Sequence, residues 1–280
     1  MVAGDCHAPF IGGFAMTRKS ISIFARMPMD SAKYLVGLIG PEVLEAAEKD
    51  LFHPVRLDLD CCGALEIRYD FFDESQWINL SERVRNIAPD KLQIGTIRLN
   101  RDGGKFADAR AIERLKLWET ILGASQAPEW LDLERDCLSD FKALNDMARP
   151  KGVSLLISEH NFVRIPNETE LETFAADVKR VGAQGLKIAA MSNSDNDCDR
   201  LYKFAKKFSK KFQMFAAFGM GETGRVSRLW SLKEGSNLTY GSIGRSEAPG
   251  QIDVSIMNRA LDKFENLNSQ MEILAFLNQF

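Results

Sequence analysis

The 280-residue sequence has little of what several classes of protein require. It contains three histidines, and no stretch approaches the ~18 consecutive apolar residues that a membrane-spanning helix needs. Acidic and basic side chains nearly balance, 39 against 36, so no global charge attracts the chain to nucleic acid or to anionic lipid. We therefore expect neither a nucleic-acid nor a membrane partner.

The five cysteines are too few and too irregularly placed for a disulfide framework or a zinc site. None is part of a C-x-x-C motif, and the adjacent pair could hardly form a disulfide without strain. The cysteines are Cys6, Cys61, Cys62, Cys137 and Cys198. This usage favours a reducing cytoplasm and predicts no metal centre.

The first 18 residues lack the basic region and the apolar run of a secretory signal peptide. No Pro/Gly/Ser-rich linker interrupts the remaining sequence. We expect a flexible extension at residues 1–18, followed by one catalytic domain over residues 19–280.

From Ser20 onward, short β-rich runs alternate with longer amphipathic stretches, which is typical of parallel βα repeats. The predicted strands are Ser20–Arg26, Ala64–Phe71, Leu92–Leu99, Glu129–Leu133, Val153–Ser158, Gly185–Met191, Phe212–Phe218 and Leu238–Ile243. Eight units in ~260 residues favour an α/β fold of the (β/α)8 TIM-barrel type, although an open doubly wound sheet shares the local pattern. In a barrel, the chemistry lies at the carboxyl ends of the strands.

Lys187 is the one charged residue in the apolar run Gly185–Met191. A buried ammonium is costly, so the amine either pairs with a carboxylate for structure or serves as a nucleophile. His160 follows the apolar strand Val153–Ser158, where a barrel presents side chains at the active-site mouth. Its alternatives are a structural hydrogen bond and general acid–base catalysis.

Other charged residues collect at the same predicted end. In the second strand Glu66, Arg68 and Asp70 share one face, because side chains alternate with a period of two. Arg98, Asp102, Asp132, Glu134, Arg225 and Arg228 follow other strands, and the last loop runs from Arg245 to Gln251. Such a cluster is suited to gripping a hydroxylated or anionic small molecule.

Two further patterns have simpler interpretations. The segment Gly219–Gly224 matches G-x-G-x-x-G, but too few βαβ units follow it for a dinucleotide site, so a tight turn is preferred. The lysine-rich stretch Leu201–Phe212 has the apolar stripe of an outer helix. Its lysines suit a solvated face better than a nucleic-acid patch.

Taken together, the motifs resemble the type I 3-dehydroquinate dehydratase family, the Schiff-base class, from about Ser20 to the end. The resemblance rests on Glu66-x-Arg68-x-Asp70, Thr96-x-Arg98 with Gly103-Gly104, Ser158-x-His160-x-Phe162, Lys187-Ile-Ala-x-Met191, Met220 with Ser227-Arg228, and Ala248-Pro-Gly-Gln251. It implies a cofactor-free lyase of the shikimate pathway of aromatic amino acid biosynthesis, converting 3-dehydroquinate to 3-dehydroshikimate. It also suggests a homodimer.

The resemblance implies specific roles. Lys187 would form an imine with the substrate ketone, and His160 would act as general base and then general acid, oriented by Asp102. The substrate-binding residues would be Glu66, Arg68 and Arg98 for the ring hydroxyls, and Arg228 and Gln251 for the carboxylate.

Three positions depart from the family pattern. Asp102 stands where the family has a glutamate, Asn161 where it has an aspartate, and Glu247 where it has the lid serine that contacts the substrate carboxylate. An ionised Glu247 would repel that carboxylate by roughly 1 to 4 kcal/mol. Two alternatives therefore stay open: a diverged Schiff-base lyase or aldolase-like enzyme acting on a related ligand, and a catalytically silent binding or sensor protein.

Overall fold

The computed structural model describes residues 33–194, 196–244 and 250–280. It contains one sheet of eight strands in the order β7-β6-β5-β4-β3-β2-β1-β8, with every neighbouring pair parallel. The strands are β1 Tyr34–Ile39, β2 Ala64–Arg68, β3 Leu92–Thr96, β4 Trp130–Glu134, β5 Ser154–Asn161, β6 Gly185–Met191, β7 Met214–Met220 and β8 Leu238–Gly241. The fold is a (β/α)8 barrel.

The two ends of the sheet meet at the start of β8. The Asn237 backbone N–H donates to the Phe215 carbonyl at 2.9 Å, and its Oδ1 accepts from the Phe215 N–H at 2.8 Å. The Asn237 carbonyl also accepts from the Tyr34 N–H at 2.7 Å. One asparagine therefore links the first strand to the last two.

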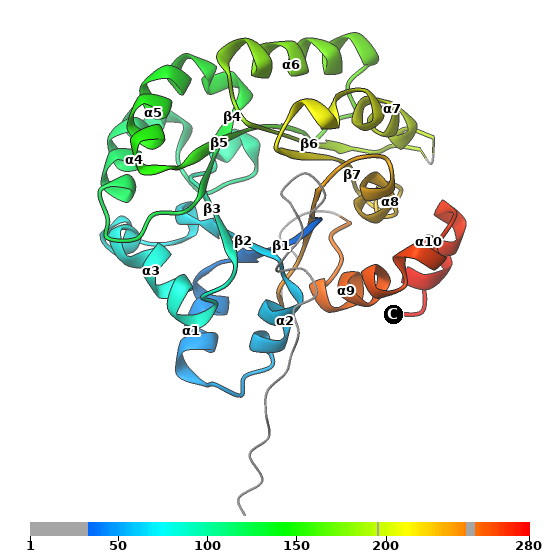
Figure 1. Ribbon diagram of the computed structural model, residues 1–280, viewed down its shortest axis with the longest axis horizontal. Helices are drawn as coiled ribbons and strands as arrows, with labels where there is room; N and C mark the ends of the chain where they lie inside the picture. The colour runs from blue at the N-terminus through cyan, green and yellow to red at the C-terminus, as the bar shows by residue number, and fades with distance from the viewer. Residues whose placement is uncertain (1–32, 195, 245–249) are drawn as a thin grey trace, which may run out of the picture.

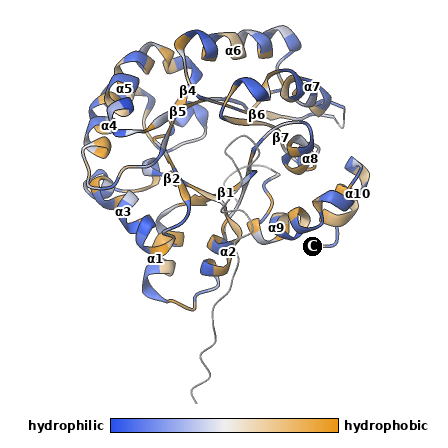
Figure 2. Cartoon of the chain, in the orientation of Figure 1, coloured by the Kyte–Doolittle hydropathy of each residue, from blue (hydrophilic) through white to orange (hydrophobic). Residues whose placement is uncertain are grey.

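Helices surround the strands (Figure 1). They are α1 Pro41–Lys49, α2 Val55–Cys61, α3 Trp77–Ile87, α4 Arg114–Leu122, α5 Phe141–Ala148, α6 Glu168–Val181, α7 Cys198–Phe208, α8 Ser227–Lys233, α9 Val254–Asp262 and α10 Gln270–Leu277. Figure 2 shows hydrophobic and hydrophilic residues alternating around these helices, as expected where one face packs on the barrel.

Seven of the eight predicted strands overlap observed strands, and the first does not. The first strand of the barrel is Tyr34–Ile39, which lay outside the prediction, and it pairs with both β2 and β8. The predicted strand Ser20–Arg26 and the predicted extension 1–18 lie outside the described residues. The boundary at residue 19 therefore stays a prediction.

The inward-facing side chains of the strands change from apolar to polar along the barrel axis. Near the amino ends they are apolar: Val36, Ala64, Ile94, Trp130, Leu156, Met214 and Leu238 form an interior cluster. Two residues further on, the same faces of neighbouring strands carry buried polar side chains: Glu66, Thr96, Asp132, Ser158 and Lys187. The apolar layer closes the bottom of the barrel and the polar layer forms the floor of a site above it.

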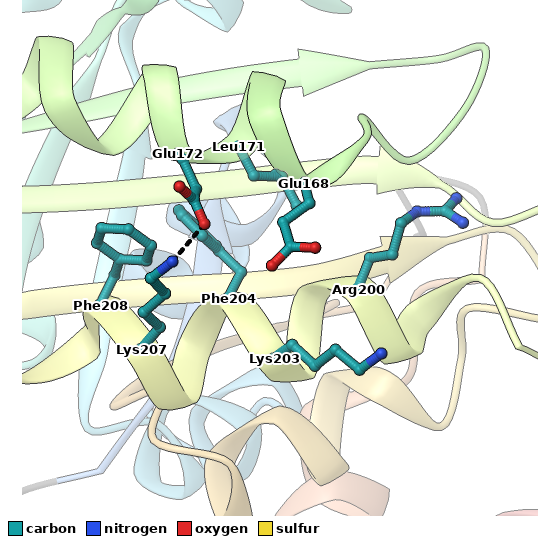
Figure 3. Close-up of a pocket in the computed structure, with 8 residues that line it drawn as sticks. All are labelled: Glu168, Leu171, Glu172, Arg200, Lys203, Phe204, Lys207 and Phe208. Carbon is teal, nitrogen blue, oxygen red and sulfur yellow. Dashed lines mark hydrogen bonds and ion pairs between the residues drawn. The ribbon is translucent and has the colours of Figure 1, made fainter.

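The lysine-rich stretch forms α7 and packs beside α6. Its buried face includes Phe204 and Phe208, while Lys207 pairs with Glu172 of α6 across a shallow groove (Figure 3). Lys206 pairs with Glu234 at 2.6 Å. These contacts fit the interpretation of an outer helix with a solvated face.

Candidate active site

A cavity of about 660 Å³, including its open mouth, lies at the carboxyl ends of the strands. Its lining is Leu38, Glu66, Arg68, Arg98, Asp102, Gly103, His160, Phe162, Lys187, Ala189, Phe218, Met220, Arg228, Tyr240 and Gln251. Eight of the nine predicted site residues are in this set. The ninth, Glu247, lies outside the described residues.

Lys187 is at the floor of the cavity and is 4% exposed. Its Nζ lies 3.0 Å from Oε2 of Glu66 and 3.3 Å from Oδ2 of Asp132, and 4.1 Å from the centre of the Tyr240 ring. The two carboxylates and the ring hold the amine in one place. Such fixation suits a nucleophile that must meet a carbonyl carbon in a defined orientation.

Arg98 joins this cluster from just beyond β3. It donates to Asp132 Oδ2 and to Ser158 Oγ, both at 2.8 Å, and Ser158 in turn donates to Asp132. Although burial disfavours its ionised form, the charges of Arg98 and Lys187 hold the pKa of Asp132 below its usual range. Asp132 is therefore a fixed negative charge under the cavity.

His160 enters the cavity from β5, and its register partner is Ala189, two residues beyond Lys187 in β6. Its Nδ1 has no hydrogen-bond partner among the described residues, and Oδ1 of Asp102 lies 4.0 Å away. Burial lowers the pKa of His160 well below its ordinary value, and the charges of Arg98 and Lys187 lower it further. The imidazole is therefore neutral at pH 7 and can accept a proton.

Arg68 points into the cavity from the end of β2 and is anchored by Asp70. Its Nε and Nη2 donate to the two Asp70 carboxylate oxygens at 3.0 and 2.8 Å. The strand ends at Arg68 rather than at Phe71 as predicted, because a 3-10 turn over Tyr69–Phe71 follows. That turn brings Asp70 back onto Arg68, so the Asp70 carboxylate pairs with the Arg68 guanidinium and fixes its position.

Arg228 approaches from α8 on another side of the cavity. Its Nε donates to the Gly250 carbonyl at 3.0 Å, and its Nη1 donates to the Tyr240 carbonyl at 3.3 Å. Burial lowers its pKa to about 10, so the guanidinium keeps its charge at neutral pH. Gln251 lines the same cavity.

Many known proteins match this chain in sequence or in fold. The family model for type I 3-dehydroquinase matches residues 46–268. The chain belongs to the type I 3-dehydroquinase family. A catabolic 3-dehydroquinate dehydratase of Acinetobacter baylyi is 32% identical over 192 residues, which is 68% of this chain and 70% of the relative. A 3-dehydroquinate dehydratase of Listeria monocytogenes is 28% identical over 237 residues, covering 82% and 91% of the two chains.

Solved structures show the same fold. A 3-dehydroquinate dehydratase from Geobacillus kaustophilus aligns with a TM-score of 0.75 at 24% identity, covering 85% of this chain and 93% of that one. A type I enzyme from Clostridium difficile, covalently modified with comenic acid, aligns with a TM-score of 0.72 at 22% identity, covering 85% and 94%. The prediction of family and barrel from the sequence is thereby confirmed.

The sequence places Glu134 among the charged residues at the strand ends but does not single out its buried partner Arg114. Glu134 accepts from the Leu99 N–H at 3.1 Å, lies 3.5 Å from Arg98, and pairs with Arg114 of α4. Their pairing extends the polar cluster of the site into the layer between strands and helices.

The segment Gly219–Gly224 forms the tight turn between β7 and α8. A Cβ on Gly224 would lie 2.5 Å from the Gly219 carbonyl carbon, so the two glycines allow the backbone to fold on itself. Ser227 Oγ accepts from the Gly219 N–H at 2.7 Å and donates to the Gly224 carbonyl. The tight turn itself therefore explains why glycines stand at these positions, without a bound dinucleotide.

The described ranges contain no group of three or more histidine, cysteine or acidic side chains placed to hold a metal ion. They also contain no helix that is both long and apolar enough to cross a membrane.

Proposed function

We propose that this chain converts 3-dehydroquinate to 3-dehydroshikimate through an imine on Lys187. Membership of the type I 3-dehydroquinase family supports this substrate. The observation that carries the chemistry is the single buried lysine at the floor of the cavity, held between Glu66 and Asp132, with a neutral histidine on the neighbouring strand. Amine and base face the same cavity, as imine chemistry requires.

In this proposal the Lys187 ammonium gives up one proton and its amine attacks the C3 ketone, and that proton then joins the departing oxygen, so that water leaves and a protonated imine remains. The imine draws electrons from the neighbouring carbon, so His160 can remove a C2 proton. The resulting enamine expels the C1 hydroxyl, which leaves as water with the proton from His160. A second water then hydrolyses the imine and releases Lys187, so the net change is the loss of one water.

The remaining cavity residues bind and orient the ring. Arg228 keeps its charge despite burial, and it would hold the substrate carboxylate together with Gln251 through charge-assisted hydrogen bonds. Glu66, Arg68 and Arg98 would contact the ring hydroxyls. Asp70 fixes the guanidinium of Arg68, and Asp132 fixes that of Arg98. Because these side chains are already ordered, substrate binding loses less conformational entropy.

Borohydride trapping tests the proposal. Incubation with 3-dehydroquinate and borohydride, followed by peptide mapping, should give a reduced adduct on Lys187, and absorbance should report the conjugated enone product. Lys187→Ala should form no adduct, whereas the matched outer-helix variant Lys203→Ala should react like the wild type. An adduct on Lys187→Ala would refute the assignment.

One sequence feature favours a second candidate function. Because Glu247 replaces the lid serine of the family pattern, a related Schiff-base substrate or a silent binding role is the alternative. Adduct formation without enone product would support that alternative. Absence of both would point to a different ligand, and an imine formed only with a ketone that lacks a carboxylate would show that Glu247 has redirected specificity.

Assembly and location belong to the same proposal. We infer a cytoplasmic homodimer, because the sequence resembles a family for which a dimer is expected and because the four described cysteines are free thiols. Light scattering coupled to size-exclusion chromatography should give about twice the 31.4 kDa chain mass. A single-chain mass would overturn the dimer.

A further inference from the structure

Tyr240 of β8 lies in the cavity and was not among the predicted site residues. It is 4% exposed, and it shares the cavity lining with Lys187, Glu66 and Arg228. In the barrel interior its backbone pairs with Val36 of β1. It therefore lies on the last strand of the sheet, two residues beyond the apolar residue Leu238 of the same strand.

Two neighbours contact the ring of Tyr240 and a third holds its backbone. Lys187 Nζ lies 4.1 Å from its centre, the Phe218 ring lies at 5.8 Å in a tilted arrangement, and the backbone carbonyl accepts from Arg228 Nη1. Both the amine that would bind the ketone and the guanidinium that would bind the carboxylate thus contact this one residue. A ring fixed in this way can aim its hydroxyl with little loss of entropy.

The hydroxyl of Tyr240 is buried and makes no hydrogen bond with acceptable geometry among the described residues. Glu66 nevertheless lies within reach of the hydroxyl: burial first, then the charges of Glu66 and Asp132, and a weak contact of the hydroxyl with the Glu66 carboxylate raise the pKa of Tyr240 well above its ordinary value. The phenol therefore stays protonated and is a donor. By contrast, the hydroxyl of the buried Tyr202 donates to Gln270 Oε1 at 3.2 Å.

A buried hydrogen-bond donor without a partner costs free energy. A ligand that accepts a hydrogen bond from this donor removes that cost when it binds. A ring hydroxyl is such a ligand group, because it donates one hydrogen bond and accepts others. The ionised Glu66 carboxylate can only accept, so a hydroxyl that donates to Glu66 keeps its own lone pairs available to accept from a second group. Tyr240 provides a donor beside Glu66.

We propose that Tyr240 is a substrate-positioning residue whose phenolic O–H donates to the ring hydroxyl that Glu66 accepts from. This inference rests on the proposed function, because the hydroxylated ring is that of 3-dehydroquinate bound at Lys187. Tyr240 and Glu66 together then distinguish a hydroxyl from a methylene or a ketone at that position. A site built to satisfy both hydrogen-bonding roles discriminates more sharply than one carboxylate alone.

The matched experiment compares Tyr240→Phe with Tyr69→Phe. Tyr69 also has a buried hydroxyl without a partner among the described residues, but it lies in the cluster between strands and helices, against Trp77 and Trp118. Both substitutions remove one oxygen and keep the ring. Tyr240→Phe changes the cavity, whereas Tyr69→Phe changes only the core.

Tyr240→Phe should raise the KM for 3-dehydroquinate about tenfold and leave kcat within about twofold, because the bond is made equally to the bound substrate and the transition state. Its unliganded melting temperature should equal or exceed that of the wild type, since the hydroxyl makes no well-formed hydrogen bond that the substitution would remove. Tyr69→Phe should leave KM unchanged. An unchanged KM for Tyr240→Phe, or a raised KM accompanied by a lowered melting temperature, would overturn the proposal.

Borohydride trapping separates this inference from the proposed function. Wild type and Tyr240→Phe should both give the Lys187 adduct at saturating 3-dehydroquinate, with Tyr240→Phe needing more substrate for half-maximal labelling. A wild type without adduct would contradict the proposed function, and the Tyr240 inference would fail with it. An adduct in both proteins at the same half-saturating concentration would contradict the Tyr240 inference alone.

Discussion

Nδ1 of His160 and Oδ1 of Asp102 are 4.0 Å apart, too far for a hydrogen bond. Asp102 belongs to a short 3-10 turn, Asn100–Asp102, that ends at Gly103 in the left-handed conformation. The carboxylate therefore faces the imidazole from a fixed loop without touching it. A base that is not oriented by its neighbour has more freedom than catalysis requires.

Lengthening this side chain should improve catalysis. Asp102→Glu adds one carbon–carbon bond of about 1.5 Å, which is enough to bring a carboxylate oxygen into hydrogen-bonding range of Nδ1. We expect kcat to rise severalfold with little change in KM, as measured by steady-state formation of the enone. A kcat that falls would show that the 4.0 Å gap is needed, for instance by a bridging water.

The pH dependence of activity should follow Asp102. Burial and then Glu134 raise the pKa of Asp102 to about 6, whereas burial lowers the pKa of His160 well below its ordinary value. The ionised fraction of Asp102 therefore grows as the pH rises through about 6, and kcat/KM should rise with it to a plateau. Asp102→Asn should remove this rise. A rise at the same pH in Asp102→Asn would assign it to another group.

His160→Ala should separate imine formation from proton transfer. Loss of the general acid–base group should lower kcat by at least about 100-fold. The lysine remains, so borohydride should still trap substrate on Lys187 in this variant. If neither adduct nor product formed, His160 would be needed already for imine formation, and its role as base at C2 would need revision.

The buried Arg114–Glu134 pair should matter for stability. Arg114→Met keeps most of the side-chain volume but leaves Glu134 short of one ionic partner, and breaking a buried pair costs about 3 to 5 kcal/mol. Urea unfolding measured by circular dichroism should show this loss. The control is Arg110→Met, because Arg110 pairs with Glu74 and Glu113 on the exposed surface. Equal midpoints for Arg114→Met and wild type would contradict the prediction.

Glu247 supplies a prediction from the sequence. If its carboxylate faces the substrate carboxylate, Glu247→Ser should lower the KM for 3-dehydroquinate, by about tenfold or more. Isosteric Glu247→Gln should produce part of the effect, since it removes the charge. A KM that stays the same or rises in both variants would show that Glu247 does not repel the substrate.

Much of the fold followed from local pattern. Strands such as Gly185–Met191 are predicted where they are observed, because a fully buried parallel strand reads as an apolar run between turns. Tyr34–Ile39 was missed although its sequence, YLVGLI, is equally apolar. The run Ser20–Arg26 carries the same strand signal in the sequence, and no local signal decides which of two such runs pairs with both β2 and β8.

The kinds of residue in the site, and their order along the chain, can be predicted from the sequence. A lone charged residue within an apolar strand, and a histidine directly after another apolar strand, are costly placements that serve few purposes. Tertiary structure alone decided how the charges pair. Asp132 and Glu66 meet Lys187 from strands far apart in the chain, Asp70 turns back onto Arg68, and Tyr240 presents an unpartnered hydroxyl to the same cavity. The physical reason is that pairing depends on barrel closure and register, which bring side chains within hydrogen-bonding distance whatever their separation in sequence.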